Sequence, residues 1–172
     1  ALAFAAEGLG GTLGASAGID WTGLSLPVLG ENLERAAQLL RLAAFEPALS
    51  DADIVAERGL LLDEAHLVAD DMFRYPFQLA LATAFGPMGY GVPLGGTPDS
   101  IPGLTPDLVR SWHARRFSST RGVLVAVGDL DPEDTAARLA AVFGDVPIAA
   151  PPRDSAMQQV RPPADGWQRV VQ

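Results

Sequence analysis

The sequence predicts an α+β fold in which a mixed, largely antiparallel sheet packs against helices. Strand-like and helix-like segments are mixed along the chain, and a hairpin pattern lies near its start, which favours α+β over a doubly wound sheet. The 172 residues, of which 48% are hydrophobic, are enough to bury a core. We expect one α+β domain over residues 1–147, followed by a Pro-rich linker and the start of the next strand or lobe over residues 148–172.

The composition excludes several kinds of partner and site. A net charge of −9 repels phosphate backbones, so nucleic acid is not an expected partner. No stretch approaches the ~18 uninterrupted apolar residues of a membrane-spanning helix, and no signal peptide is recognisable, so no membrane partner is expected and the compartment stays unknown. Without cysteine, disulfides and thiolate metal sites are excluded. Because the chain lacks an initiator Met, we expect it to start inside a longer protein.

The first third of the chain predicts a helix, a hairpin and a second helix. Gly10 and Gly11 suit the C-terminal cap of the first helix. The hairpin pairs residues 12–17 with residues 20–29 across a turn. Apolar side chains at helical spacing then predict a helix over residues 33–44.

A capping box predicts the start of a long helix after Ser50. Asp53 follows three residues later, as the second member of such a box does. The expected apolar face consists of Ile54, Leu61, Leu62, Ala65 and Val68. A further helix is predicted up to Gly86, and the Gly- and Pro-rich stretch that ends at Gly103 predicts a long loop, either functional or packed on itself.

The last part of the chain predicts a helix, a strand and another helix. Thr105 at the N-cap and Pro106 at the first helical position open a helix that runs to about Phe117. The continuous apolar run in "RGVLVAVGD" predicts a strand buried on both faces. Asp131 and Pro132 open the final helix.

Two motif-like stretches are better explained by the ends of helices. "GLGGTLG" has the glycines of a dinucleotide fingerprint, but a helix precedes it and a strand follows, the reverse of the required order. "DLDPED" lacks the glycine and distal glutamate of a calcium loop and fits a helix N-cap. Glu64 and His66 point about 200° apart on a helix and cannot share one metal ion. We expect surface or packing roles for His66 and His113.

The stretch "ERGLLLDE" places two acids on one face of the long helix. Seven residues are almost two helical turns, so Glu57 and Glu64 project from the same side, ~10 Å apart along the axis. Residues 60–62 lie between them and are expected to seat the helix. On the pattern alone, a solvated rim is the simpler interpretation, and a role in chemistry stays open.

"FEPALSDADIVAERGLLLDE" resembles the segment that follows the inverted zinc motif in the pitrilysin/insulinase family of zinc metallopeptidases, which includes the mitochondrial processing peptidases. Three further stretches resemble this family in the same order. These are "GGTLGASAGIDWTGLSLPVL" for an edge hairpin, "GYGVPLGGTPDSIPGLTPDLVRSWHARRF" for a loop and helix, and "VLVAVGDLDPEDTAARLAAVFGDVP" for a strand–helix unit. The resemblance covers nearly the whole chain and implies an incomplete metallopeptidase fold of the processing-peptidase type.

The resemblance implies roles for five residues. Glu64 matches the distal carboxylate that completes the zinc site, and Glu57 matches a second acid that supports catalysis or orients a ligand. Gly14, Ala15 and Ser16 match the edge strand that pairs with an extended peptide substrate, although the family often has Asn where Gly14 stands. The two zinc histidines and the general-base glutamate of the family lie in a His-x-x-Glu-His motif on an earlier helix.

That His-x-x-Glu-His motif does not occur in the chain, and the resemblance places it upstream of Ala1. We therefore expect zinc as the cofactor of the parent protein, with no zinc bound tightly by this chain and no activity of the chain alone. Two interpretations stay open. The chain is an internal part of an active protease, which its two glutamates favour, or part of a non-catalytic half or subunit that helps to enclose a peptide substrate. A second family domain or subunit could close the chamber in either case, and a purely structural subunit is a third class.

Overall fold

The computed structural model describes residues 2–117 and 122–146 of the chain, and these residues form two compact units. The described residues of the first unit are 2–17, 21–48, 111–117 and 122–146. Those of the second unit are 18–20 and 49–110. The expected linker over residues 148–172 lies outside the described residues, so the division at residue 147 stays a prediction.

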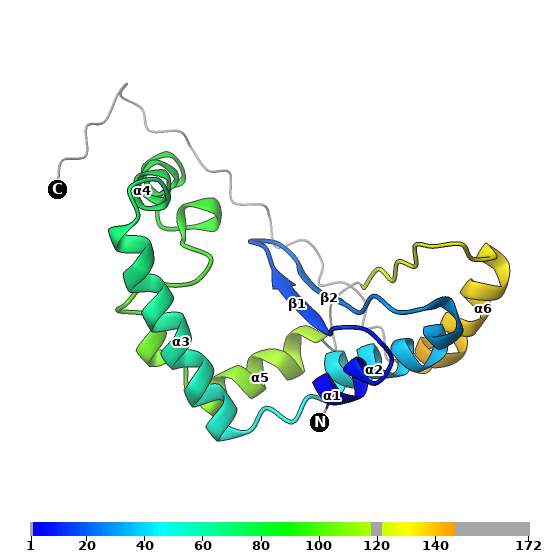
Figure 1. Cartoon of the computed structure of the whole chain (residues 1–172). Coiled ribbons are helices and arrows are strands. Elements are labelled where there is room, and N and C mark those ends of the chain that lie inside the picture. The colour runs from blue at the N-terminus through cyan, green and yellow to red at the C-terminus, as the bar shows by residue number, and fades with distance from the viewer. Residues whose placement is uncertain (1, 118–121, 147–172) are drawn as a thin grey trace. The chain divides into compact units, whose positions relative to one another are not determined.

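Three helices, α1, α2 and α6, pack together in the first unit (Figure 1). Helix α1 (Leu2–Glu7) contacts α2 (Leu33–Phe45), which follows a short 3-10 turn, η1 (Gly30–Asn32). The fully buried residues of α1 and α2 are Ala6, Ala36 and Ala37. Such short side chains let the two helix axes approach closely. Helix α6 (Pro132–Phe143) lies on α2 as well, and the guanidinium of Arg41 donates a 3.0 Å hydrogen bond to the carboxylate of Asp145.

The first unit also contains the hairpin that the sequence predicts. Strand β1 (Gly14–Ala17) pairs antiparallel with β2 (Thr22–Ser25), with Gly14 opposite Ser25 and Ala17 opposite Thr22. Both strands are shorter than expected. Among the described residues this two-stranded ribbon is the only sheet, so the residues outside it are helices, turns and extended chain.

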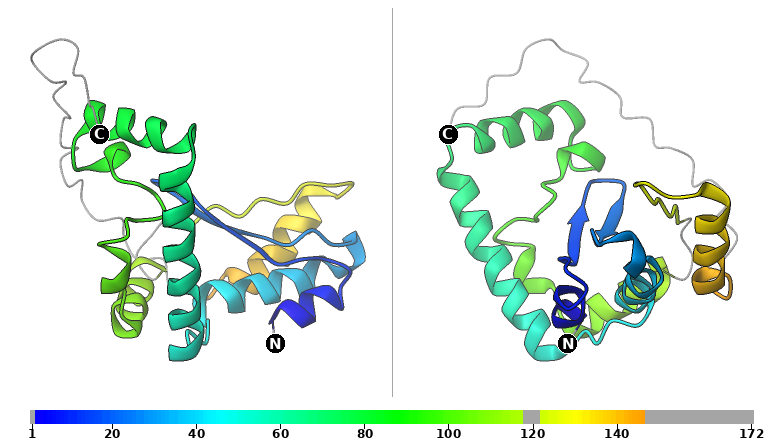
Figure 2. Two further views of the ribbon diagram at one scale, coloured as in Figure 1. Left: turned by 60° about the vertical axis from the view of Figure 1, so that its left-hand side comes forward. Right: turned by 45° about the vertical axis from the view of Figure 1, so that its right-hand side comes forward.

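The second unit is a helical corner followed by a long loop. Figure 2 shows α4 (Arg74–Phe85) leaving the end of α3 (Asp51–Asp70) at a sharp angle. The loop after α4 includes the 3-10 turns η2 (Gly89–Gly91) and η3 (Ile101–Gly103), and it leads into α5 (Pro106–Phe117), whose later residues belong to the first unit. The loop packs on its neighbours, because η3 contacts α3 and Ile101 is only 1% exposed.

The helix ends follow the predicted capping residues. The hydroxyl of Ser50 accepts a hydrogen bond from the amide of Asp53 at 3.2 Å, and the carboxylate of Asp131 accepts one from the amide of Asp134 at 2.8 Å. Gly86 ends α4 with a φ of 70°, a left-handed conformation that disfavours side chains with a Cβ. Within the described part of the chain, no helix is both long and apolar enough to cross a membrane.

The predicted strand at "RGVLVAVGD" is wrong for the structure described. Residues 122–127 are extended but hydrogen-bond to no neighbouring strand, and Val123 and Val127 are 88% and 91% exposed. Leu124 and Val127 line one side of an apolar groove of about 710 Å³, and α6 lines the other with Leu139 and Phe143. A strand buried on both faces needs paired strands beside it and a layer on each side. Among the described residues, α6 packs beside this segment but no strand pairs with it.

We expect Ser50→Ala to lower the free energy of unfolding by about 1 kcal/mol, because the amide of Asp53 loses its side-chain acceptor at the start of α3. Urea unfolding followed by circular dichroism measures the change. Ser25→Ala is the control, because Ser25 ends an exposed strand and caps no helix; its effect should stay within about 0.5 kcal/mol. Equal effects of the two substitutions would contradict the capping role.

Candidate functional site on helix α3

The two glutamates lie on the exposed face of α3. Both are exposed, whereas Ile54 and Val68, one turn before Glu57 and one turn after Glu64, are buried. Glu57, Leu60, Glu64 and Leu67 follow one another at spacings of three and four residues and therefore share one side of the helix. Both of these leucines are 63% exposed.

The expectation that residues 60–62 seat the helix is therefore wrong for Leu60. Leu61 and Leu62 are half-buried, whereas Leu60 points to solvent beside the acids. The reason is the helical period: a residue three positions after Glu57 must lie on the same face as Glu57. The exposed face of α3 thus combines two carboxylates with apolar side chains, a composition that differs from an all-polar solvated rim.

Glu64 is engaged by an arginine from the next helix. One guanidinium nitrogen of Arg74 donates to the Glu64 carboxylate at 2.5 Å, and the two side chains are 53% and 50% exposed. Sequence reasoning missed this partner. The available signal was Asp71, which suits an N-cap and would have placed Arg74 in the first turn of α4, next to the end of α3.

Asp71 fixes the backbone at this corner. Its carboxylate accepts hydrogen bonds from the amides of Phe73 and Arg74, each at 2.8 Å. Both bonds stabilise the charged form of the carboxyl and hold the pKa of Asp71 below its usual value. The bond from the amide of Arg74 has the larger effect, followed by that from Phe73. Arg74 therefore lies in a helical turn whose first amides are hydrogen-bonded to Asp71.

Glu57 differs from Glu64 in its surroundings. It is exposed, and it forms no hydrogen bond or ion pair with other described residues. Its neighbour Arg58 instead points away, toward the loop, and donates to the carbonyl of Leu104 at 3.3 Å. The two neighbouring residues of the motif therefore differ: Glu57 is exposed to solvent, and Arg58 links α3 by a hydrogen bond to the residue before α5.

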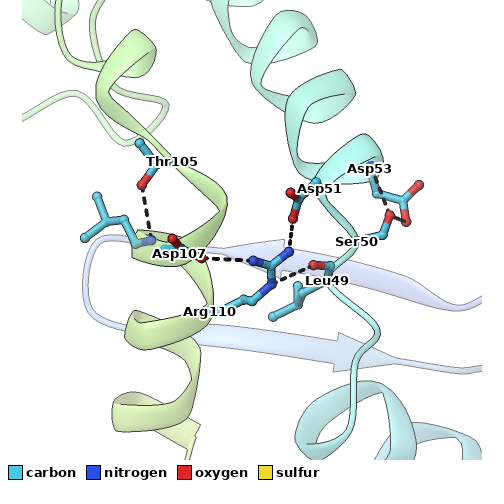
Figure 3. A network of polar contacts seen from close by, with 8 residues as sticks. Leu49, Ser50, Asp51, Asp53, Thr105, Asp107 and Arg110 are labelled. Atoms are coloured by element: carbon cyan, nitrogen blue, oxygen red, sulfur yellow. Dashed lines mark hydrogen bonds and ion pairs between the residues drawn. The ribbon is translucent and has the colours of Figure 1, made fainter.

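A second arginine fixes the start of α3 (Figure 3). The guanidinium of Arg110 bonds to the carboxylate of Asp51, to that of Asp107 at 3.1 Å and to the carbonyl of Leu49 at 3.1 Å. The hydrogen bond to Asp51 raises the pKa of Arg110 above its ordinary value. Leu49 has a φ of 42°, a left-handed conformation that is uncommon for a residue with a Cβ. Arg110 holds the carbonyl of this strained residue in place.

The candidate substrate-binding residues lie on β1 in the first unit. Gly14, Ala15 and Ser16 pair with β2 along one edge of the strand. The Oγ of Ser25 lies 2.8 Å from the position that a Cβ on Gly14 would occupy, so a larger residue here requires Ser25 to move. The structure therefore groups the predicted residues as two sets, the glutamates on α3 and these three residues on β1, each within its own unit.

The described residues do not form a complete zinc site. Among them no group of three His, Cys, Asp or Glu side chains lies close enough to hold a metal ion. Glu64 offers one carboxylate, which is a suitable zinc donor by its chemistry, but tetrahedral zinc takes at least three protein ligands. His113 has a packing role: it stacks on Phe117 with ring centroids 4.4 Å apart, and its Nε2 lies 2.8 Å from the carbonyl oxygen of Ala44.

Comparisons with known proteins show a similarity to M16 peptidases. Residues 103–172 match the family model for the peptidase M16 inactive domain. The crystal structure of a peptidase M16 inactive domain from Pseudomonas fluorescens superposes with a TM-score of 0.77 at 22% identity, covering 90% of this chain and 38% of that one. A protease from Helicobacter pylori gives a TM-score of 0.73 at 16% identity, covering 94% of this chain and 38% of that one. The fold is that of M16 peptidases.

Sequence relatives agree with the fold. The chain is 30% identical over 158 residues to an uncharacterized zinc protease of Mycobacterium leprae, covering 90% of this chain and 36% of that protein. It is 27% identical over 139 residues to an uncharacterized zinc protease of Streptomyces coelicolor, covering 81% of this chain and 30% of that protein. The chain is similar to M16 peptidases over the family-model match and along these relatives, and it spans about a third of the relatives' length.

The family match begins at residue 103, after the residues of the candidate site. Helix α3, with Glu57 and Glu64, and strand β1 both precede the stretch that matches the inactive domain. The stretches that carry the candidate residues therefore lie outside the part of the chain that the family model matches.

We expect Asp71→Asn to lower stability at neutral pH and to have less effect as the pH falls. The folded-state pKa of Asp71 is lowered, so its charge contributes stability above its unfolded pKa, and this contribution disappears as the pH falls through the folded pKa. Urea unfolding at a series of pH values between about 7 and 3 measures the difference between the two proteins. A difference that grows toward acid would contradict the assignment.

Proposed function

We propose that this chain is part of a zinc-dependent metalloendopeptidase that hydrolyses peptide bonds in small or unfolded polypeptides, and that it is inactive alone. The observation that carries the proposal is the pair of glutamates seven residues apart on the exposed face of α3, in a chain whose relatives are named zinc proteases. These acids stand in water beside exposed leucines, where a further layer of protein can cover them.

The proposed roles follow from the surroundings of each side chain. Glu64 would hold zinc through one carboxylate oxygen, and the remaining ligands would come from outside the described residues. Zinc, when bound, supplies a Lewis acid and an acidified water. Glu57, which has no partner among the described residues, is available to orient a ligand or to support catalysis. The edge of β1 offers backbone groups of Gly14, Ala15 and Ser16 to an extended peptide.

A second function is favoured by a specific observation. Residues 103–172 match an inactive domain, and the described residues contain no group of metal ligands. On this alternative, the chain belongs to a non-catalytic half or subunit that helps to enclose the substrate. In both cases we propose that a second family domain or subunit closes the chamber.

We expect Glu64→Gln in the full-length gene product to reduce peptidase activity by more than roughly 100-fold. Mutation of a residue that only hydrogen-bonds to a metal ligand typically costs roughly 10- to 100-fold, and loss of a ligand itself should cost more. A neutral amide is a much weaker zinc ligand than a carboxylate. Cleavage of a fluorogenic peptide measures kcat/KM. Asp63→Asn is the matched control, because it removes the same charge from the adjacent exposed position and should leave activity unchanged. Full activity of Glu64→Gln would exclude the ligand role.

We expect the chain of 172 residues to bind zinc with a dissociation constant weaker than micromolar, because one carboxylate does not make a tetrahedral site. Isothermal titration calorimetry with zinc tests this. Submicromolar binding by the chain would contradict the proposal that its ligands lie elsewhere. The full-length gene product separates the two functions: zinc binding with peptidase activity supports the catalytic one, and absence of both supports the enclosing partner.

A further inference from the structure

We propose that residues 122–127 form an inner strand of a larger sheet in the full-length gene product, and that the neighbouring strands come from the part of that polypeptide outside these 172 residues. In Figure 1 this segment is the extended run that leads to α6. Among the described residues no strand pairs with it, although its backbone is extended. The proposal does not depend on the proposed function, because none of the candidate site residues lies in this segment.

The two faces of the segment differ in their surroundings. Successive side chains of an extended chain point to opposite faces, so Val123 and Val125 share one face and Leu124 and Ala126 share the other. Leu124 and Ala126 line the apolar groove beside α6. Val123 and Val125 are 88% and 72% exposed, and Val127, at the rim of the groove, is also exposed. One face is therefore packed on a helix, and the other is apolar and uncovered.

The composition of this stretch suits a strand that is paired along both edges. Residues 122–128 read "GVLVAVG" and contain no charged residue, no polar side chain and no proline. Edge strands of natural sheets usually carry charges, prolines or bulges that prevent further pairing, whereas a short continuous apolar run is typical of a strand inside a sheet. An uncharged run of high β propensity that stays in solvent is a template for aggregation. Pairing on both edges removes that hazard.

The length of the relatives indicates where the neighbouring strands come from. The chain covers 36% and 30% of the two zinc protease relatives, so most of a protein of that length lies outside it. A second copy of the chain, paired strand to strand across a two-fold axis, would cover one edge of the segment and leave the other open. The rest of the same polypeptide can supply a strand to each edge and a layer over Val123 and Val125.

Hydrogen exchange of the full-length gene product, followed by mass spectrometry, tests the pairing. We expect the amides of residues 123–127 to exchange at least roughly 100-fold more slowly than unprotected amides, because strands on both sides hydrogen-bond to them. The amides of α6, which are bonded within a helix of the same unit, are the internal reference for protection. Exchange of residues 123–127 at the unprotected rate would overturn the proposal.

A photoreactive diazirine side chain in place of Val123 identifies the neighbouring segment. After illumination, mass spectrometry of the digested protein should locate crosslinks from position 123 to residues of the same polypeptide outside these 172 residues. Crosslinks confined to the 172 residues would overturn the proposed source of the strands. Crosslinks that join two polypeptides, seen as a doubled mass on a denaturing gel, would assign the neighbouring strand to a second copy and overturn it as well.

Val125→Lys measures whether the uncovered face is covered in the full-length gene product. We expect this variant to lower the unfolding temperature by more than about 5 °C or to prevent folding, because a covered apolar face does not accommodate an unpaired charge. Ala137→Lys is the matched control: Ala137 is exposed on the side of α6 away from the groove, and the same added charge should shift the unfolding temperature by less than about 2 °C. Equal small shifts in both variants would contradict a covered face. Failure of Val125→Lys alone to fold supports it, and the exchange measurement on the unaltered protein does not depend on either variant.

Discussion

The hydrogen bonds of Arg110 are the constraint on which the second unit depends. This one guanidinium bonds to the carboxylate of Asp51 at the start of α3, to the carboxylate of Asp107 at the start of α5, and to the carbonyl of Leu49, the residue two positions before α3 (Figure 3). Leu49 has a left-handed backbone that costs energy in a residue with a Cβ, and the bond to its carbonyl offsets part of that cost. These bonds hold the first turn of α3, the helix that carries both glutamates.

Polar contacts hold α3 at its other end as well. Asp71 caps the next helix, and Arg74 reaches back from it to Glu64. Between the two ends, Ile54 and Val68 are the buried residues of this 20-residue helix. Exposed polar contacts at the two ends of α3 therefore add to a small amount of apolar burial. A helix held in this way keeps its outer face, with its two acids and its leucines, available for further contacts.

Sequence reasoning succeeded where the signal is local. Ser50 and Asp131 cap the helices that they were expected to cap, and Gly86 ends α4, because each acts on backbone groups within a few residues. It failed at residues 123–127, where an apolar run becomes a strand only if other strands lie beside it. It also missed the bond between Arg74 and Glu64, which depends on the angle of a corner and not on helical spacing.

The two glutamates show how far a spacing alone can be taken. The separation of seven residues correctly placed Glu57 and Glu64 on one face of the helix. The spacing alone does not distinguish the two residues from one another, and it does not distinguish a functional site from two solvated surface acids. The structure makes them different: one is paired with a base from another helix, and the other stands in solvent. It also exposes Leu60 between them, at 63% of its surface. Helical spacing predicts that two acids share a face, but the contact that distinguishes them comes from Arg74 on the next helix, which the spacing does not contain.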